Sequence, residues 1–178
     1  MIECGEVLLR PHVMQDAKAI ADLANDPLIG HMTHLPYPYT LKDAKVWLKQ
    51  QKKRQKQGDH IGFSILLAKT QELIGAIELE LFDHAEGEAE LGIWIGAPFR
   101  YKGYASMAVQ ALIKYAVQST TLMRLIAYIR TDNMISRQLV ESIGMQRGDE
   151  MLLSSSAVIE PVIAYQLDLR GCRSDACD

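Results

Sequence analysis

The chain has 178 residues, 48% of them hydrophobic and 23% charged, which suits one globular domain with a core of its own. A formal net charge of −3 gives no overall attraction to nucleic acid, and the spacing of the three cysteines fits neither a zinc site nor a disulfide framework. No apolar run is long enough to span a membrane and the first residues lack the apolar core of a signal peptide, so we expect a single cytoplasmic domain over residues 1–170 and a polar, flexible tail over 171–178.

The first elements predicted along the chain are a strand and a short helix. Residues 6–10 form an apolar run that a proline ends, as is typical of a strand. A helix is expected over 17–24, with Asp16 as its N-cap. The sequence Asn-Asp-Pro at 25–27 ends this helix, because the residue before a proline avoids the helical region.

A second helix follows an irregular segment. Residues 28–39 contain two prolines and are expected to be irregular. The helix begins at Thr40, where Asp43 completes a near capping box, and its end carries the basic run 52–56 before Gly58. Basic side chains complement the dipole at a helix C-terminus, so we interpret this run as capping and solubilising rather than as a nucleic-acid patch. The inner face of the helix carries Ala44, Trp47, Leu48 and Gln51.

Three antiparallel strands are expected next. The apolar pattern changes after residue 61, and strands are predicted over 63–68, 73–81 and 88–95. A short turn separates the first two strands, and a hairpin loop over 83–87 separates the second from the third.

The rest of the chain alternates helices and strands. A helix over 105–118, a strand over 124–129 and a helix over 134–143 are followed by two β segments over 145–153 and 162–169. A helical crossover between two strands makes them parallel neighbours. The order predicts an α+β fold with a mixed, mostly antiparallel sheet and helices on both of its faces.

The junction between the third strand and the helix over 105–118 has the chemistry of a phosphate-binding loop. A helix N-terminus offers unpaired N–H groups and a partial positive charge, and Gly103 lets a ligand approach the backbone. Arg100 and Lys102 add formal charge. The loop matches neither a P-loop nor a G-x-G-x-x-G dinucleotide fingerprint, and its pattern is R-x-x-G-x-A. The alternative interpretation is an ordinary connection with solvated basic residues.

The pattern R-x-x-G-x-A at 100–105 resembles the Q/R-x-x-G-x-G/A signature with which the GNAT superfamily of acyl-CoA N-acyltransferases grips the pyrophosphate of coenzyme A. Three further blocks resemble its RimJ/RimL-like branch, the ribosomal-protein N-terminal acetyltransferase type. They are the opening L-L-R-P to D-P over 8–27, L-P-Y-P-Y-T at 35–40, and N-M-I-S to G-M over 133–145. Because these blocks span nearly the whole chain in order, the chain is identified as a member of this superfamily, with the GNAT fold.

The resemblance implies transfer of the acetyl group of acetyl-CoA to a primary amine, without a metal. The acceptor that it suggests is the α-amine of a protein N-terminus. Small amines such as amino acids, polyamines or antibiotics are the alternative acceptors, and a non-catalytic acyl-CoA-binding module is the alternative to an enzyme. The implied partners are acetyl-CoA and the amine acceptor, with no nucleic acid or membrane, for a monomer or a homodimer. The residues implied to hold the cofactor are Ile93, Trp94, Ile95, Arg100, Tyr101, Lys102, Gly103, Tyr104, Ala105, Asn133, Ser136 and Arg137.

The resemblance also places the oxyanion donor among the backbone N–H groups of residues 93–95, where a bulge splays the strand from its neighbour. A base must take the proton of the amine, and the candidates by position are Glu78, Glu80, Glu88 and Glu90. We expect Glu90 to be this base, because it lies nearest the cofactor strand, and Glu78 to line an acidic acceptor cleft. The alternative is that these alternating glutamates form the solvated face of the sheet.

The acid that many GNAT enzymes carry on the helix over 134–143 is missing. Their tyrosine, four residues before the closing glycine, corresponds to Val140 here. The resemblance suggests Ser136 as the group near the thiol, with an ordinary first-turn serine as the alternative. Asn133 is expected to cap the helix and to bind the pantetheine arm, and Arg137 to reach either the cofactor phosphates or solvent.

Two histidines and two tyrosines lie in the segment expected to be irregular. His31 and His34 have the spacing H-x-x-H, but a metal site needs a third ligand and none is evident, so zinc is not expected. We expect these histidines to line the acceptor cleft together with Tyr37 and Tyr39.

Overall fold

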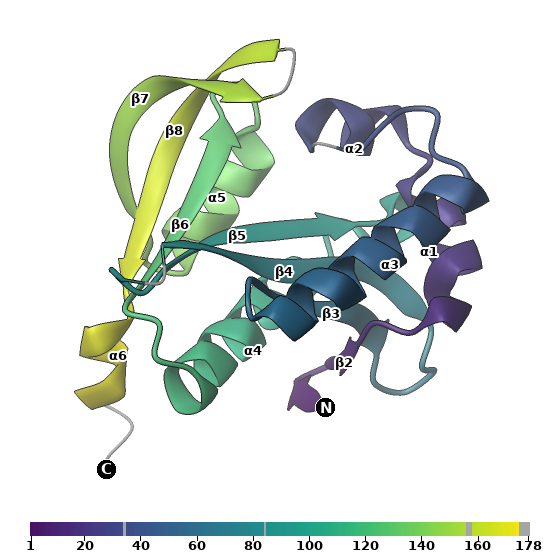
Figure 1. The fold of residues 1–178 in the computed structure, drawn as a ribbon, viewed down its shortest axis with the longest axis horizontal. Coiled ribbons are helices and arrows are strands. Elements are labelled where there is room, and N and C mark those ends of the chain that lie inside the picture. Colours follow the sequence, from purple (N-terminus) through teal and green to yellow (C-terminus); the bar gives the residue numbers. More distant parts are fainter. Residues whose placement is uncertain (34, 84, 156–157, 175–178) are drawn as a thin grey trace.

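The computed structural model describes residues 1–33, 35–83, 85–155 and 158–174 and contains one eight-stranded sheet (Figure 1). The strands lie in the order β1-β2-β3-β4-β5-β6-β8-β7. Their bounds are β1 Ile2–Cys4, β2 Val7–Pro11, β3 His60–Leu67, β4 Leu73–Asp83, β5 Glu88–Ile95, β6 Arg124–Arg130, β7 Gln146–Ser155 and β8 Val158–Asp168.

Helices lie on both faces of this sheet, so the α+β architecture that the sequence predicts is confirmed. Short 3-10 turns precede α1 and follow β5. The helical bounds are η1 Met14–Asp16, α1 Ala17–Ala24, α2 Pro27–Met32, α3 Leu41–Gln57, η2 Ala97–Phe99, α4 Tyr104–Ser119, α5 Met134–Ser142 and α6 Leu169–Ser174.

The pairing of the central strands follows from their connections. β3, β4 and β5 are joined by short turns and pair antiparallel, as expected. Because α4 crosses over between β5 and β6, these two strands pair parallel, which confirms the prediction from the helix between them. β6, β8 and β7 complete the sheet with antiparallel pairs.

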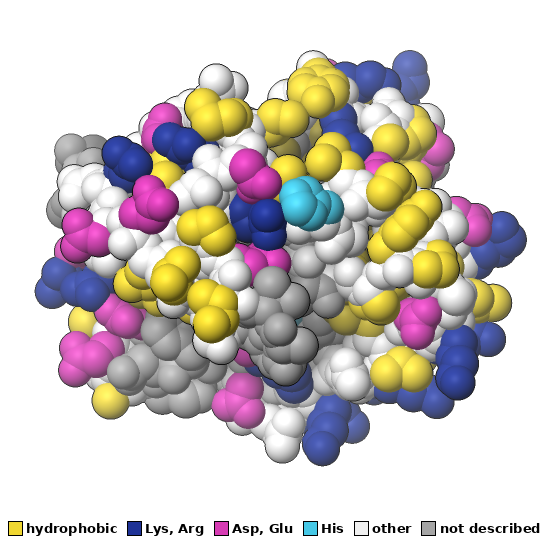
Figure 2. Space-filling view, turned by 90° about the horizontal axis from the view of Figure 1, so that it is seen from above, with side chains coloured by type: hydrophobic (Ala, Val, Ile, Leu, Met, Phe, Trp, Pro, Cys, Tyr) yellow, Lys and Arg dark blue, Asp and Glu magenta, His cyan; other side chains and the backbone are white. Residues whose placement is uncertain are grey.

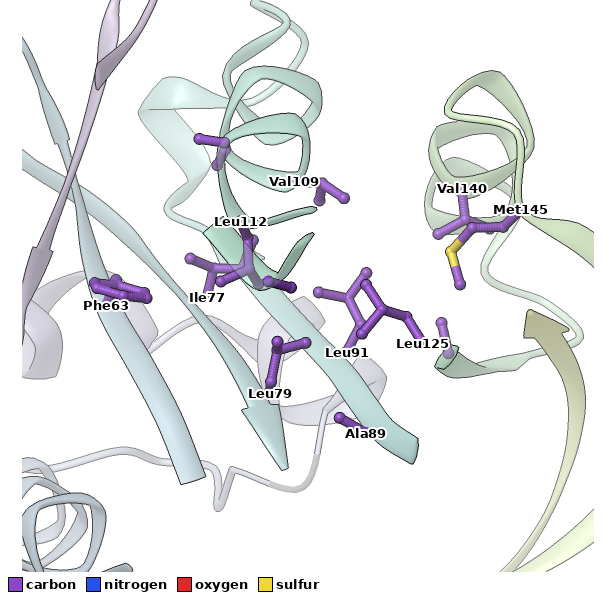
Figure 3. Close-up of a cluster of buried hydrophobic side chains, with 14 of the residues drawn as sticks. Phe63, Ile77, Leu79, Ala89, Leu91, Val109, Leu112, Leu125, Val140 and Met145 are labelled. Atoms are coloured by element: carbon purple, nitrogen blue, oxygen red, sulfur yellow. The ribbon is translucent and has the colours of Figure 1, made fainter. Parts of the chain in front are cut away.

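Two cores hold the helices to the sheet. α1 and α3 pack on one face, against β3 and β4, and α4 packs on the other, against β1, β2, β4 and β5. On the α4 face, Val109 and Leu112 of α4 project toward Ile77 and Leu91 of the sheet (Figure 3). Leu112 and Ile77 are fully buried, and each such side chain stabilises the fold by roughly 1.5–3 kcal/mol.

The helix α2 replaces part of the segment expected to be irregular, so that prediction is wrong for residues 28–32. Asp26 accepts a hydrogen bond from the Leu28 N–H at 2.8 Å, and Pro27 occupies the first turn, where its missing N–H costs nothing. The sequence Asn-Asp-Pro therefore both ends α1 and begins α2. Asp16 occupies the N-cap position of α1, as expected, but its carboxylate bonds Val13 N–H and Arg10 and makes no capping hydrogen bond to α1.

The end of the chain is helical further than the sequence suggests. α6 follows β8 directly and extends into the segment for which a flexible tail is expected, while residues 175–178 lie outside the described part of the chain. Leu169, its first residue, is fully buried in the core beneath α4.

Candidate active site

The loop before α4 is built around Gly103, as the sequence predicts. Gly103 is the N-cap of α4 and has a φ of +80°, a conformation that strains other residues. It has no side chain to accept the hydrogen bonds of the first-turn N–H groups, so an anion can accept them. Tyr104 and Ala105, which begin the helix, line the adjoining pocket.

The basic residues of this loop divide into two environments. The Arg100 guanidinium binds the Asp26 carboxylate at 2.6 Å and donates through Nε to the Ile95 carbonyl at 2.9 Å. Its charge is therefore neutralised within the protein, and Arg100 fixes the position of the loop. Lys102 lies over the Phe99 ring, with Nζ 5.7 Å from the ring centroid.

A first pocket of about 280 Å³, the cofactor pocket, brings together most of the predicted cofactor residues. α2 forms one wall through Leu28, Ile29 and Met32, which the sequence had left in an irregular segment. The predicted residues that line it are Ile93, Trp94, Ile95, Arg100, Tyr101, Gly103, Tyr104, Ala105, Asn133 and Ser136.

β5 and β6 separate beside this pocket. Their parallel pairing covers only Glu88 to Glu90 of β5, after which the two strands diverge (Figure 1). The register between β4 and β5 stays regular beyond that point, so the divergence does not depend on a bulge against β4. It opens the space in which a thioester could reach the edge of β5.

The backbone of β5 offers hydrogen-bond donors to this space. Gly96 donates its N–H to Ile74 of β4 at 2.9 Å, and the direction of N–H groups alternates along an antiparallel strand. The N–H groups of Ile93 and Ile95 consequently point away from β4, toward the gap before β6. They occupy the place expected for an oxyanion donor.

A second pocket of about 340 Å³, the acceptor pocket, opens on the other side of Ile93. It lies between α3, which provides Gln51 and Arg54, and the diverging strands β5 and β6. Four residues of the predicted site line both pockets, and these shared residues mark where the pockets meet: Ile93, Trp94, Asn133 and Ser136.

Three carboxylates line the acceptor pocket. Glu80 is paired with Arg54 at 2.7 Å, and Glu90 stands opposite Glu80 in the β4–β5 register. Glu78 accepts a hydrogen bond from Gln51 Nε2 at 2.9 Å. Enclosure by the protein, reinforced by the charge of Glu80, raises the pKa of Glu78 to about 7, although 34% of its side chain remains exposed to the concave pocket. Glu78 is therefore partly enclosed beside Gln51 of α3, whereas half of the Glu80 side chain remains exposed to solvent.

The start of α5 carries the remaining predicted groups. Asn133 accepts a hydrogen bond from the Ser136 N–H at 3.1 Å, which confirms it as the helix cap. Val140 is buried where many GNAT enzymes carry the tyrosine. Arg137 donates to the Thr131 carbonyl at 2.9 Å and is absent from the linings of both pockets, so the structure does not bring it to the cofactor pocket.

Comparison with known protein families shows to which family the chain belongs. A family model described as an acetyltransferase (GNAT) domain matches residues 6–146. The chain belongs to the GNAT acetyltransferase family. It is an acetyl-CoA-dependent N-acetyltransferase, and the predicted GNAT fold is confirmed.

The relatives of this acetyltransferase include uncharacterized N-acetyltransferases and one that is named for a ribosomal-protein substrate. It is 30% identical over 140 residues to the uncharacterized N-acetyltransferase p20 of Bacillus licheniformis, with 78% of each chain covered. It is 35% identical over 74 residues to the ribosomal-protein-serine acetyltransferase of Escherichia coli K12, covering 42% of this chain and 41% of the other. The second match supports the RimJ/RimL-like branch.

Solved structures share the fold at low sequence identity. RimL, a ribosomal L7/L12 alpha-N-protein acetyltransferase solved with coenzyme A, has a TM-score of 0.83 at 16% identity, covering 92% of this chain and 94% of the other. Spermidine N-acetyltransferase of Vibrio cholerae, solved with CoA and spermine, has a TM-score of 0.78 at 18% identity, covering 93% and 96%.

The acetyltransferase does not bring His31, Tyr37 or Tyr39 into either pocket. His31 lies 3.4 Å from Asp132 through Nε2 and 3.5 Å from Arg130, on the surface. Tyr37 is 56% exposed and packs beside Gly30, and His34 lies outside the described residues. On the face that carries α2 and the adjoining ends of β7 and β8, hydrophobic side chains lie scattered among basic and acidic ones (Figure 2).

Sequence reasoning missed the α3 side of the acceptor pocket. Trp47, Gln51 and Arg54 line it, and a glutamine on the inner face of a helix was the available signal. Among the described residues, no group of three or more His, Cys, Asp and Glu side chains is arranged to hold a metal ion. The described helices are also too short or too polar to cross a membrane.

Proposed function

We propose that this acetyltransferase transfers the acetyl group of acetyl-CoA to the α-amine of a protein N-terminus in the cytoplasm, by direct attack of the amine on the thioester. One observation carries the proposal. The outward N–H of Ile93 lies where a pocket with a helix N-terminus meets a pocket with three carboxylates. The names of the Escherichia coli relative and of RimL support a protein acceptor.

The site residues divide the chemistry among them. The first turn of α4 holds the pyrophosphate, and Asn133 lies beside the pantetheine arm. The Ile93 N–H stabilises the oxyanion of the tetrahedral intermediate. Ser136 lines both pockets, so its hydroxyl is placed to donate a hydrogen bond to the departing thiolate in the absence of the tyrosine.

A small polycationic amine is the second candidate acceptor. Glu78, Glu80 and Glu90 line one pocket, where Arg54 is paired with Glu80. Such a pocket attracts any cation, and the structural resemblance to a spermidine N-acetyltransferase fits the same acceptor class.

Thiol release from acetyl-CoA separates these acceptors. The panel contains peptides beginning with serine, alanine or methionine, the same peptides blocked at the N-terminus, spermidine, free amino acids and an aminoglycoside. We expect kcat/KM for free N-terminal peptides to exceed that for small amines by about tenfold or more, and blocked peptides to be inert. Turnover confined to small amines would reject the protein acceptor. Acetyl-CoA binding without turnover of any amine would reject the catalytic proposal.

A further inference from the structure

The placement of Glu78 depends on a glycine in the neighbouring strand. Gly92 faces Glu78 across the β4–β5 pair. A Cβ built on Gly92 would lie 3.2 Å from the Glu78 Cγ and 3.4 Å from its Oε1. The Glu78 side chain therefore extends over Gly92, which immediately precedes Ile93 and its outward N–H. A larger residue at Gly92 would displace the carboxylate from this position.

A hydrogen bond from Gln51 determines which carboxylate oxygen of Glu78 faces the oxyanion donor. Gln51 is buried on the inner face of α3, and its Nε2 donates to Oε2 of Glu78 at 2.9 Å. The Nε2 of the buried His60 lies 3.7 Å from the same oxygen. Since both groups approach Oε2, it is Oε1 that lies over Gly92, next to the strand that carries the oxyanion donor.

The other two carboxylates of the pocket are placed less well. Glu80 is engaged by Arg54. Glu90 precedes Ile93 by three residues, which is roughly 10 Å along a strand, and it lies where β5 and β6 are still paired. It therefore lies at the closed end of the gap, whereas Glu78 reaches the open part.

We infer that Glu78, rather than Glu90, is the general base that takes the proton of the acceptor ammonium, and that Gln51 and Gly92 position its carboxylate. This inference rests on the proposed acetyl transfer. Glu78 removes one proton from RNH3⁺, and the free amine attacks the thioester carbonyl to form the C–N bond. The tetrahedral intermediate expels the thiolate as the C–S bond breaks. The thiolate takes the second proton of the amine nitrogen, and Glu78 releases its own proton to water, leaving the amide and CoA thiol.

The surroundings of Glu78 suit a base near neutral pH. Enclosure and the charges of Glu80 and Glu90 raise its pKa, while Arg54 and the Gln51 hydrogen bond lower it, with a net value of about 7. Burial lowers the pKa of His60 to about 4, so His60 is neutral near pH 7. Among the described residues, the other charged or titratable groups that line this pocket or interact with Glu78 are Tyr39 from the segment before α3, and Tyr128 and Arg130 from β6.

The test compares Glu78→Gln with the matched variant Glu90→Gln in the full chain. The acceptor is a peptide beginning with serine, or spermidine if peptides are inert. We expect Glu78→Gln to lower kcat/KM by about 100-fold or more and to abolish the ionisation near pH 7 in its pH profile. Glu90→Gln should keep the ionisation and lower kcat/KM far less than Glu78→Gln does, through a higher KM for the cationic acceptor, because it removes one negative charge from the acceptor pocket. Acetyl-CoA affinity by calorimetry should be unchanged in both. Glu78→Asp provides a second variant that keeps the ionisation but lowers the rate.

Two further variants test the positioning. Gln51→Leu removes a hydrogen bond to the charged form, so the kinetic pKa should rise, whereas a merely structural role would leave it unmoved. Gly92→Ala should lower kcat without changing acetyl-CoA affinity. An active wild type with an unaffected Glu78→Gln variant overturns the inference alone. A wild type inactive on every amine overturns the proposed function and the inference with it.

Discussion

Gly103 and Gly58 share a backbone conformation but lie at different kinds of helix end. Their φ values are +80° and +84°, and neither has an atom closer than 4.0 Å to a Cβ built on it. Gly103 begins α4 beside the cofactor pocket, whereas Gly58 ends α3 away from both pockets. A substitution at either position meets the same backbone strain of roughly 1–2 kcal/mol, so the pair separates strain from ligand contact.

We expect Gly103→Asp to weaken acetyl-CoA binding by about tenfold or more, because its side chain enters the phosphate site and adds like charge. Both substitutions strain the backbone, so Gly58→Asp should lower the free energy of unfolding by about as much as Gly103→Asp does. Gly58→Asp should leave the affinity for acetyl-CoA unchanged. Isothermal calorimetry measures the affinities, and urea unfolding measures the stabilities. Wild-type affinity in Gly103→Asp would refute the phosphate assignment.

The residues of the site differ in how far the sequence alone could place them. Gly103 follows from a local pattern, since a glycine between a strand and the first turn of an apolar helix is typical of a phosphate-binding loop. The choice between Glu78 and Glu90 has no local signature. It depends on Gln51, 27 residues from Glu78 in sequence, and on a glycine in the opposite strand, so it appears only when α3 and β5 are packed together.

At the scale of elements, α2 depends on Asp26 for two contacts. One carboxylate oxygen caps the helix through the Leu28 N–H, and the other binds Arg100. Asp26 thereby ties two walls of the cofactor pocket together, α2 on one side and the loop before α4 on the other. The local sequence around Asp26 predicted only the end of a helix. The contact of Asp26 with Arg100 could not be predicted locally, because Arg100 lies in a distant loop.

Substitutions at Asp26 separate these contacts. Asparagine caps a helix about as well as aspartate, so Asp26→Asn loses only the charge opposite Arg100. Asp26→Ala loses the cap as well. We expect the free energy of unfolding to fall in the order wild type, Asn, Ala, with the two variants about 1 kcal/mol apart. Urea unfolding at pH 7 measures this series. Equal stability of the two variants would show that Asp26 is not acting as a cap.

At the scale of the whole molecule, most of the fold could be predicted from the order of strands and helices along the chain. Strict strand and helix periods, together with one helical crossover, are sufficient to predict the antiparallel run and the parallel pair of β5 and β6. The positions of His31 and Tyr37 were not predictable in this way. His31 lies in the last turn of the short helix α2 and Tyr37 lies just beyond it, and the orientation of this helix depends on contacts across the molecule.

A buried polar network beneath α3 makes the stability of the molecule depend on pH. His12 bonds Ser64 at 2.9 Å, and Ser64 donates to Asp16 at 2.8 Å. His60 lies close by and is only 2% exposed, and neither of its ring nitrogens has a hydrogen-bond partner within the described chain. Burial lowers the pKa of both histidines from 6.5 to about 4.

The sign of the histidine effect follows from where the protons bind. The unfolded chain protonates each histidine near pH 6.5, whereas the folded protein resists protonation until about pH 4. Their stabilising contribution is complete above pH 6.5 and is lost as the pH falls toward 4. Glu78 acts in the opposite direction, because its raised pKa lets the folded state take up a proton first. The pH dependence of wild-type stability is therefore the sum of the histidine contribution, which falls with decreasing pH, and the Glu78 contribution, which rises.

The variant His60→Leu isolates the contribution of His60 to the pH dependence of stability. From pH 7 to pH 5, wild type should lose about 2 kcal/mol more unfolding free energy than His60→Leu, because each unit of pKa difference corresponds to about 1.4 kcal/mol. Urea unfolding of both proteins at the two pH values gives this difference directly. Parallel losses in wild type and His60→Leu would mean that His60 takes up its proton as readily in the folded protein as in the unfolded chain.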